Sequence, residues 1–244
     1  MIRRPPRPTL DRSSAASDVY KRQVTTVAPD REQSATSNSL TLHHPLRARQ
    51  NSDGTWVVDG TPTDCVLLAL NELLIEQPDV CVSGVNHGPN MGEDVLYSGT
   101  VAAAMEATFM GIPAVALSHA GYEHGQLEGW EPIVVKILQS ILGQAALAAG
   151  TLFNVNLPRI APADVQGFRV TSLGQRRYAE SITRANDPSG REYFWIGGGV
   201  ASWQGGADSD FQAVNEGYVS VTPLNLDLTN YKQLEEIRAW DLTL

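Results

Sequence analysis

Short apolar runs alternate with longer segments of helical periodicity over residues 24–156. Beyond Asn156 this alternation stops, and short strand-like runs are separated by turn residues. Strands are expected at residues 24–28, 56–59, 79–85 and 114–118, and helices at 62–74, 100–110 and 130–142. Strands that alternate with helices of this length predict an α/β fold with a doubly wound, mainly parallel, Rossmann-like sheet.

Two of these helices carry terminal signals. Thr61 suits an N-cap, Pro62 the first helical position and Asp64 the third position of a capping box. The helix expected at 100–110 is followed by Gly111 and then Pro113, which is typical of a helix end.

The C-terminal third has shorter strands and more turns. Strands are expected at residues 168–171, 192–196 and 218–222, and a closing helix at 232–240. Turns such as 187–190, rich in Asp, Pro and Gly, separate them. We therefore expect an α/β core over residues 24–156 and an antiparallel C-terminal appendage over residues 157–244.

The first 23 residues differ from the rest. They hold six basic residues against two acidic ones, a net charge of +4. Because the whole chain has a net charge of −9, residues 24–244 carry a net charge of −13. Three prolines stand within residues 5–8, and no strand or helix period follows them. The leader is either a disordered tail or a foreign segment joined to the middle of a domain, and the abrupt apolar start at Val24 favours the second.

Composition excludes several classes of protein. Hydrophobic residues make up 42% of the 244 residues, which suits a globular core, and no apolar run approaches the roughly 20 residues that span a membrane. The net charge opposes binding to nucleic acid polymers. Cys65 and Cys81 lie in apolar contexts, so we expect buried thiols and a cytoplasmic location.

Polar clusters follow the predicted strands at residues 28–38, 83–90 and 97–100. Ligand sites of open parallel sheets gather at this edge. A helix that begins after Ser98 and Gly99 presents free N–H groups to a phosphate, although an ordinary helix cap has the same appearance. No glycine-rich nucleotide fingerprint is present, and of the five histidines only His87 falls within a cluster.

Five strings of the chain together resemble the survival-protein SurE family. They lie at residues 27–42, 60–65, 82–92, 97–106 and 216–223, and the resemblance runs in consistent order over about residues 24–242. It implies a divalent-metal phosphatase that converts nucleoside 5'-monophosphates to nucleoside and phosphate. It also implies a homodimer or homotetramer in which the C-terminal part packs between subunits.

The resemblance implies roles for individual residues. Ser34 and Asn86 map onto metal ligands, and Asn90, Ser98, Gly99 and Thr100 map onto the phosphate site. Such oxygen ligands suit Mg²⁺ or Mn²⁺, and a bound cation can activate water against a phosphate dianion.

One part of the family pattern is missing. The resemblance implies an opening strand and an adjacent pair of aspartates before Val24, but no Asp-Asp pair precedes Ser34. Asp11 and Asp18 stand alone, and we do not assign them the ligand role. We therefore expect impaired catalysis; the alternatives are a non-catalytic phosphate- or nucleotide-binding protein and an unstable fragment without function.

Overall fold

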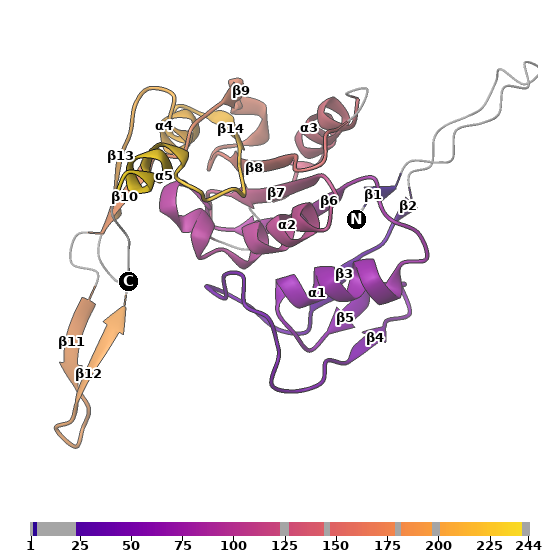
Figure 1. Cartoon of the computed structure of the whole chain (residues 1–244), viewed down its shortest axis with the longest axis horizontal. Coiled ribbons are helices and arrows are strands. Elements are labelled where there is room, and N and C mark those ends of the chain that lie inside the picture. The colour runs from indigo at the N-terminus through magenta and orange to yellow at the C-terminus, as the bar shows by residue number, and fades with distance from the viewer. Residues whose placement is uncertain are drawn as a thin grey trace, which may run out of the picture.

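The computed structural model describes residues 2–3, 23–122, 127–143, 147–178, 182–196 and 201–240. Its centre is a five-stranded sheet in the order β6-β7-β8-β14-β9 (Figure 1). The strands are β6 (Cys81–His87), β7 (Ala114–His119), β8 (Leu152–Leu157), β9 (Gly167–Val170) and β14 (Tyr218–Pro223). β6, β7 and β8 run parallel, β14 is antiparallel to β8, and β9 is parallel to β14. The predicted α/β fold with a mainly parallel sheet is confirmed.

Helices cover both faces of this sheet. The two longest are α2 (Gly99–Phe109) and α3 (Glu131–Leu142). Alternate residues of β7 point to opposite faces, as a strand requires. Ala114 and Ala116 pack in a cluster with α2, whereas Val115 and Leu117 pack in a second cluster with Trp130 at the start of α3. The doubly wound arrangement therefore follows from the near-continuous apolar sequence of a strand buried on both faces.

A second, three-stranded sheet has the order β3-β5-β4. Its strands are β3 (Val27–Pro29), β4 (Ala48–Gln50) and β5 (Trp56–Val58), and the helix that follows is α1 (Pro62–Leu68), continued by η1 (Ala69–Leu73). The predicted capping box is confirmed, because the side chain of Thr61 accepts from the N–H of Asp64 while the carboxylate of Asp64 accepts from the N–H of Thr61. Among the described strands, β3 and β6 each pair on one side only, so both are sheet edges.

The start of the chain contributes little to these sheets. β1 (Ile2–Arg3) pairs antiparallel with β2 (Gln23–Val24) in a separate two-stranded sheet. Residue 1 and residues 4–22 of the leader lie outside the described part. The strand expected at 24–28 is divided into β2 and β3, because residues 25 and 26 belong to neither strand.

The C-terminal part differs from the sequence expectation. The strands expected at 168–171 and 218–222 are β9 and β14, which lie in the central sheet rather than in an antiparallel appendage. Two antiparallel pairs of the described C-terminal residues lie outside it. They join β10 (Gln175–Tyr178) to β13 (Ala201–Gln204) and β11 (Ile182–Asn186) to β12 (Glu192–Ile196). Figure 1 shows the β11–β12 pair projecting from the body. Shorter elements are η2 (Gly92–Leu96), η3 (Pro162–Asp164), α4 (Asp210–Asn215) and the expected closing helix α5 (Tyr231–Arg238).

Both cysteines are buried and free, as predicted. Burial, with the nearby charges of Asp64 and Asp30, raises the pKa of the Cys65 thiol to about 12, and burial raises that of Cys81 to about 11. Neither thiol is therefore a nucleophile at neutral pH.

Within the described ranges, every helix is too short or too polar to cross a bilayer.

Candidate functional site

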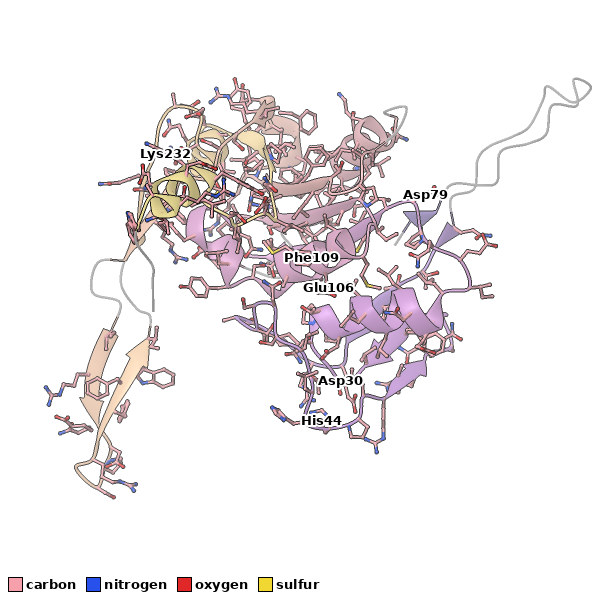
Figure 2. All side chains as sticks on the ribbon, viewed as in Figure 1. Asp30, His44, Asp79, Glu106, Phe109 and Lys232 are labelled. Carbon is pink, nitrogen blue, oxygen red and sulfur yellow. The ribbon has the colours of Figure 1, made fainter. Side chains whose placement is uncertain are left out.

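The candidate site lies where β3 and β6 end. Asp30 follows β3 directly, and Asp79 precedes β6. In Figure 2 the label of Asp79 lies near β1 and β2, and that of Asp30 lies lower and nearer the centre, below α1. The polar segments after β3 and after β6 both reach the start of α2, because the N–H of Ser37 donates to the carbonyl of Tyr97 and the Thr100 hydroxyl donates to Asn86 Oδ1.

The N-terminus of α2 is built as a cap with free amides. Ser98 is 8% exposed, and its Oγ accepts a hydrogen bond from the N–H of Val101 (3.1 Å). The first intrahelical bond runs from the N–H of Ala102 to the carbonyl of Ser98 (2.9 Å). The N–H groups of Gly99 and Thr100 precede it, so they face the helix entrance, where the helix dipole favours an anion.

Asn86 is tied to this turn. The Thr100 hydroxyl donates to Asn86 Oδ1 (3.2 Å), and Asn86 Nδ2 donates to the carbonyls of Gly88 (2.8 Å) and His87 (3.2 Å). These bonds fix the amide with its oxygen toward α2. The structure thus brings together Asn86, Ser98, Gly99 and Thr100, four of the six residues that the resemblance singles out.

Asn90 points into the protein instead. It is 7% exposed, its Nδ2 donates to Ser118 Oγ (2.7 Å), and its N–H donates to Asn156 Oδ1 (2.9 Å). Its carbonyl accepts from Asn154 Nδ2 (2.8 Å) and Asn156 Nδ2 (3.0 Å). The Asn90 amide nitrogen is therefore engaged in a buried network that holds the loop after β6 on β7 and β8. Sequence reasoning missed this network, although two asparagines in the apolar strand β8 were a signal for it.

Ser34 lies in the segment that follows β3. It is exposed, and its hydroxyl donates to Glu32 (2.9 Å). The same segment reaches α2, because the N–H of Ser37 donates to the carbonyl of Tyr97 (3.2 Å). The sequence prediction that Ser34 and Asn86 share one metal ion stays a prediction.

The described residues do not fit a divalent metal ion. Within these ranges no group of three or more His, Cys, Asp or Glu side chains could hold one. The two predicted ligands, the Ser34 hydroxyl and the Asn86 amide, carry no charge, and Asn86 Oδ1 already accepts a hydrogen bond from Thr100. Magnesium and manganese sites rest on carboxylates, which this pair lacks.

The histidines do not form a catalytic group in the described part. His43 and His44 are exposed, and His124 lies outside the described residues. His119 is 1% exposed, and its Nδ1 accepts from the N–H of Gly121 (3.1 Å). Burial is the main cause that lowers the pKa of His119, and the neighbouring His87 and Arg159 lower it further. His119 is therefore a neutral interior residue at pH 7.

Fold and site together define a doubly wound α/β protein with a polar edge at the ends of its parallel strands. A model of the family described as survival protein SurE matches residues 8–180. The 5'-nucleotidase SurE of Gemmatimonas aurantiaca is 55% identical over 217 residues, which cover 88% of this chain and 86% of that protein. The 5'-nucleotidase SurE of Methylococcus capsulatus is 47% identical over 218 residues, 89% of this chain and 86% of that protein.

A solved structure agrees with these sequence matches. The crystal structure of the SurE protein from Aquifex aeolicus has a TM-score of 0.76 and 40% sequence identity, covering 87% of this chain and 86% of that one. The chain belongs to the survival protein SurE family.

Proposed function

We propose that the chain is a phosphatase of the 5'-nucleotidase type, a phosphoric monoester hydrolase that acts on nucleoside 5'-monophosphates. The relatives that carry this name support the proposal. The observation that carries it is the first turn of α2, where Gly99 and Thr100 present free amides beside the Asn86 amide. A terminal phosphate is a compact dianion that suits such a turn.

The chain's own residues bind and orient in this proposal. The first amides of α2 bind the phosphate oxygens, and Ser98 keeps the turn in shape through its bond to Val101. Asn86 fixes the Thr100 hydroxyl by accepting a hydrogen bond from it. Asn90 contributes indirectly, by anchoring the loop between Asn86 and α2 on the buried asparagines of β8.

A divalent metal ion, Mg²⁺ or Mn²⁺, would supply activated water to such an enzyme, and the family resemblance would make Ser34 and Asn86 two of its ligands. Among the described residues, no group of three or more His, Cys, Asp or Glu side chains could hold that ion. We therefore propose that this chain hydrolyses its substrate slowly. A loss of several kcal/mol of charge stabilisation corresponds to orders of magnitude in rate, because each 1.36 kcal/mol is about tenfold.

The test compares two purified proteins. One is this chain, and the other carries a family opening strand and an Asp-Asp-Gly loop in place of residues 1–23. Phosphate release from a nucleoside 5'-monophosphate is followed with added manganese or magnesium. We expect a rate at least about a hundredfold higher for the second protein. Equal metal-dependent rates would show that the aspartate pair is dispensable and that the assignment of the site is wrong.

The second candidate is a non-catalytic phosphate- or nucleotide-binding protein. It is favoured by the lack of an acidic metal cluster within the described ranges. Equilibrium binding of a nucleoside monophosphate without any turnover, in both proteins of the comparison, would select it. A cytoplasmic location remains a prediction from the sequence.

We also propose that the C-terminal part joins subunits into a homodimer or homotetramer. The β11–β12 hairpin exposes a run of large apolar side chains, with Phe194, Trp195 and Ile196 at 59%, 66% and 90% exposure. Large apolar side chains exposed on both faces of a hairpin are typical of interaction sites. Light scattering tests the proposal: Trp195→Ser is expected to lower the molar mass toward that of a monomer, and Tyr231→Ser, in exposed α5, is the control.

A further inference from the structure

The segment 33–41 carries Ser34 and makes hydrogen bonds both within itself and to neighbouring elements. Within it, the Thr36 hydroxyl donates to the carbonyl of Gln33 (2.9 Å) and the N–H of Ser39 donates to the carbonyl of Thr36 (3.2 Å). The segment is neither helix nor strand, and two of its residues, Ala35 (φ 57°) and Ser37 (φ 52°), have left-handed backbones. This conformation costs a non-glycine residue about 1 kcal/mol or more. It persists where bonds from neighbouring elements fix it as well.

Asp64 makes one set of these bonds. It is 2% exposed in the first turn of α1, yet it reaches the far end of the segment. Its Oδ1 accepts from the N–H of Thr41 (3.0 Å), and its Oδ2 accepts from the Thr41 hydroxyl (2.6 Å) and from the N–H of Thr61 (2.8 Å). One carboxylate thus caps a helix and holds a loop.

Gly60, in the turn that precedes α1, lies close to the same carboxylate. A Cβ atom at Gly60 would lie 2.7 Å from Asp64 Oδ2, closer than real Cβ atoms approach. Two further bonds join the same turn to the segment. The Thr61 hydroxyl donates to the carbonyl of Ser39 (2.7 Å), and Gln33 Nε2 donates to the carbonyl of Gly60 (3.2 Å).

The other side of the segment rests on the N-terminus of α2. Ser37 donates through its N–H to the carbonyl of Tyr97 (3.2 Å) and through its hydroxyl to the carbonyl of Leu96 (2.5 Å). A Cβ atom at Gly99 would lie 2.9 Å from Thr36 Oγ1 and 3.0 Å from Pro62 Cγ. The segment, the start of α1 and the start of α2 therefore meet at Gly99.

We propose that Asp64 is a positioning residue, which holds the segment carrying Ser34 against the phosphate-binding turn of α2 without touching the substrate. The inference rests on the proposed function for the role of that turn, and on the hydrogen bonds above for the clamp itself. Charge suits the role, because a carboxylate accepts several hydrogen bonds at once. Burial raises the pKa of Asp64, but the bonds from Thr41 and Thr61 outweigh it and the pKa lies below its ordinary value.

The sharpest variant is Thr41→Val. It removes the hydroxyl that donates to Asp64 and leaves the capping box of α1 intact, so helix formation is not the quantity under test. Thr41→Ser keeps the hydroxyl and serves as the rescue. Thr151→Val is the matched control, because it removes a hydroxyl bond of similar length (2.7 Å, to the carbonyl of Ala148) from another half-buried threonine.

Two measurements are made on the full chain. Amide hydrogen exchange follows the segment 33–41, and calorimetry gives the affinity for inorganic phosphate. Loss of a hydrogen bond to a buried carboxylate is expected to speed exchange in the segment about tenfold or more in Thr41→Val, with no change in α1. Phosphate binding should weaken about three- to tenfold. Thr41→Ser and Thr151→Val should match the parent chain in both measurements.

The outcomes separate the two claims. Unchanged exchange of the segment in Thr41→Val overturns the clamp. Faster exchange with unchanged phosphate affinity overturns the positioning role. A parent chain that binds no phosphate overturns the proposed function, and the exchange data still decide whether the clamp at Asp64 exists. Asp64→Asn, which keeps the volume of the side chain, should exceed the effect of Thr41→Val wherever it folds.

Discussion

Replacing Asp210 by alanine is expected to destabilise the protein by about 2–4 kcal/mol. Asp210 is fully buried (0% exposed) at the start of α4. Its Oδ2 accepts from the N–H of Gly92 (2.8 Å), and its Oδ1 accepts from the N–H groups of Gly174 (3.0 Å) and Phe211 (2.9 Å). The carboxylate therefore joins the C-terminal part to the loop that leads from Asn90 to α2.

The magnitude follows from the groups that the alanine leaves behind. Gly92 and Gly174 are buried, and each unsatisfied buried N–H costs about 1–3 kcal/mol. The two amides together would cost about 2–6 kcal/mol. Because the alanine variant no longer has to bury a carboxylate, the net loss of stability is expected in the lower half of this range. Against a total stability of roughly 5–15 kcal/mol, this is a large fraction.

Urea unfolding at pH 7 measures the effect. Asp210→Asn keeps one acceptor oxygen and should lose about half as much as the alanine variant. Asp208→Ala, an exposed aspartate two residues away, is the control and should stay within about 0.5 kcal/mol of the parent. A loss below about 1 kcal/mol for Asp210→Ala would refute the reasoning, because the two amides would then have other partners.

The same residue predicts a pH dependence. Burial raises the pKa of Asp210, and the bonds from Gly92, Gly174 and Phe211 only partly offset it, so the folded state binds this proton more tightly than the unfolded state. Stability from this group is full below the unfolded pKa of about 4 and falls as the pH rises through the folded pKa. We expect the parent chain to lose more stability than Asp210→Asn as the pH rises above about 4.

Three further changes have defined outcomes. Gly99→Ala places a Cβ atom 2.9 Å from a neighbouring side chain and should lose about 1–3 kcal/mol in thermal unfolding, with weaker stabilisation by added phosphate. Asn156→Leu leaves the buried N–H of Asn90 without its acceptor and should cost about 1–3 kcal/mol in urea unfolding. The pKa of Asp64 lies below its ordinary value, so its contribution should be present above pH 4 and lost as the pH falls below it, seen as faster exchange of residues 33–41.

The sequence predicted those parts of the fold that depend on near neighbours. The start of α1 was predicted residue by residue, because a capping box and a proline at the first position act within one helical turn. The start of α2 was predicted within one residue for the same reason. Ser98 was interpreted either as an ordinary helix cap or as part of an anion site. The two interpretations have the same geometry, since both use the free amides of the first helical turn.

Contacts between distant segments could not be predicted. The strand pattern of residues 218–222 states that a strand forms but not which strand it pairs with, and β14 lies between β8 and β9. Asn90 follows a strand, as a site residue would, yet its side chain donates inward to Ser118, 28 positions away. The sequence pattern indicated only the helix-capping role of Asp64. Its hydrogen bond with Thr41 could not be predicted, because the same carboxylate accepts from Thr41 and from the N–H of Thr61.

β6 and β7 were both predicted as apolar strands but differ in burial, and their places in the sheet explain the difference. β7 is buried along its whole length, whereas β6 is half-buried with Gly84 exposed, because among the described strands β6 pairs only with β7. β3 is the matching edge of the smaller sheet.

A parallel strand between β3 and β6 would unite the two sheets and bring its carboxyl end between the segments of Ser34 and Asn86. The chain with a restored opening strand should therefore gain stability together with activity, since each new ladder bond adds about 0.5–1.5 kcal/mol. Urea unfolding of the two proteins checks this, and a gain in activity with unchanged stability would show that the new strand does not join these edges.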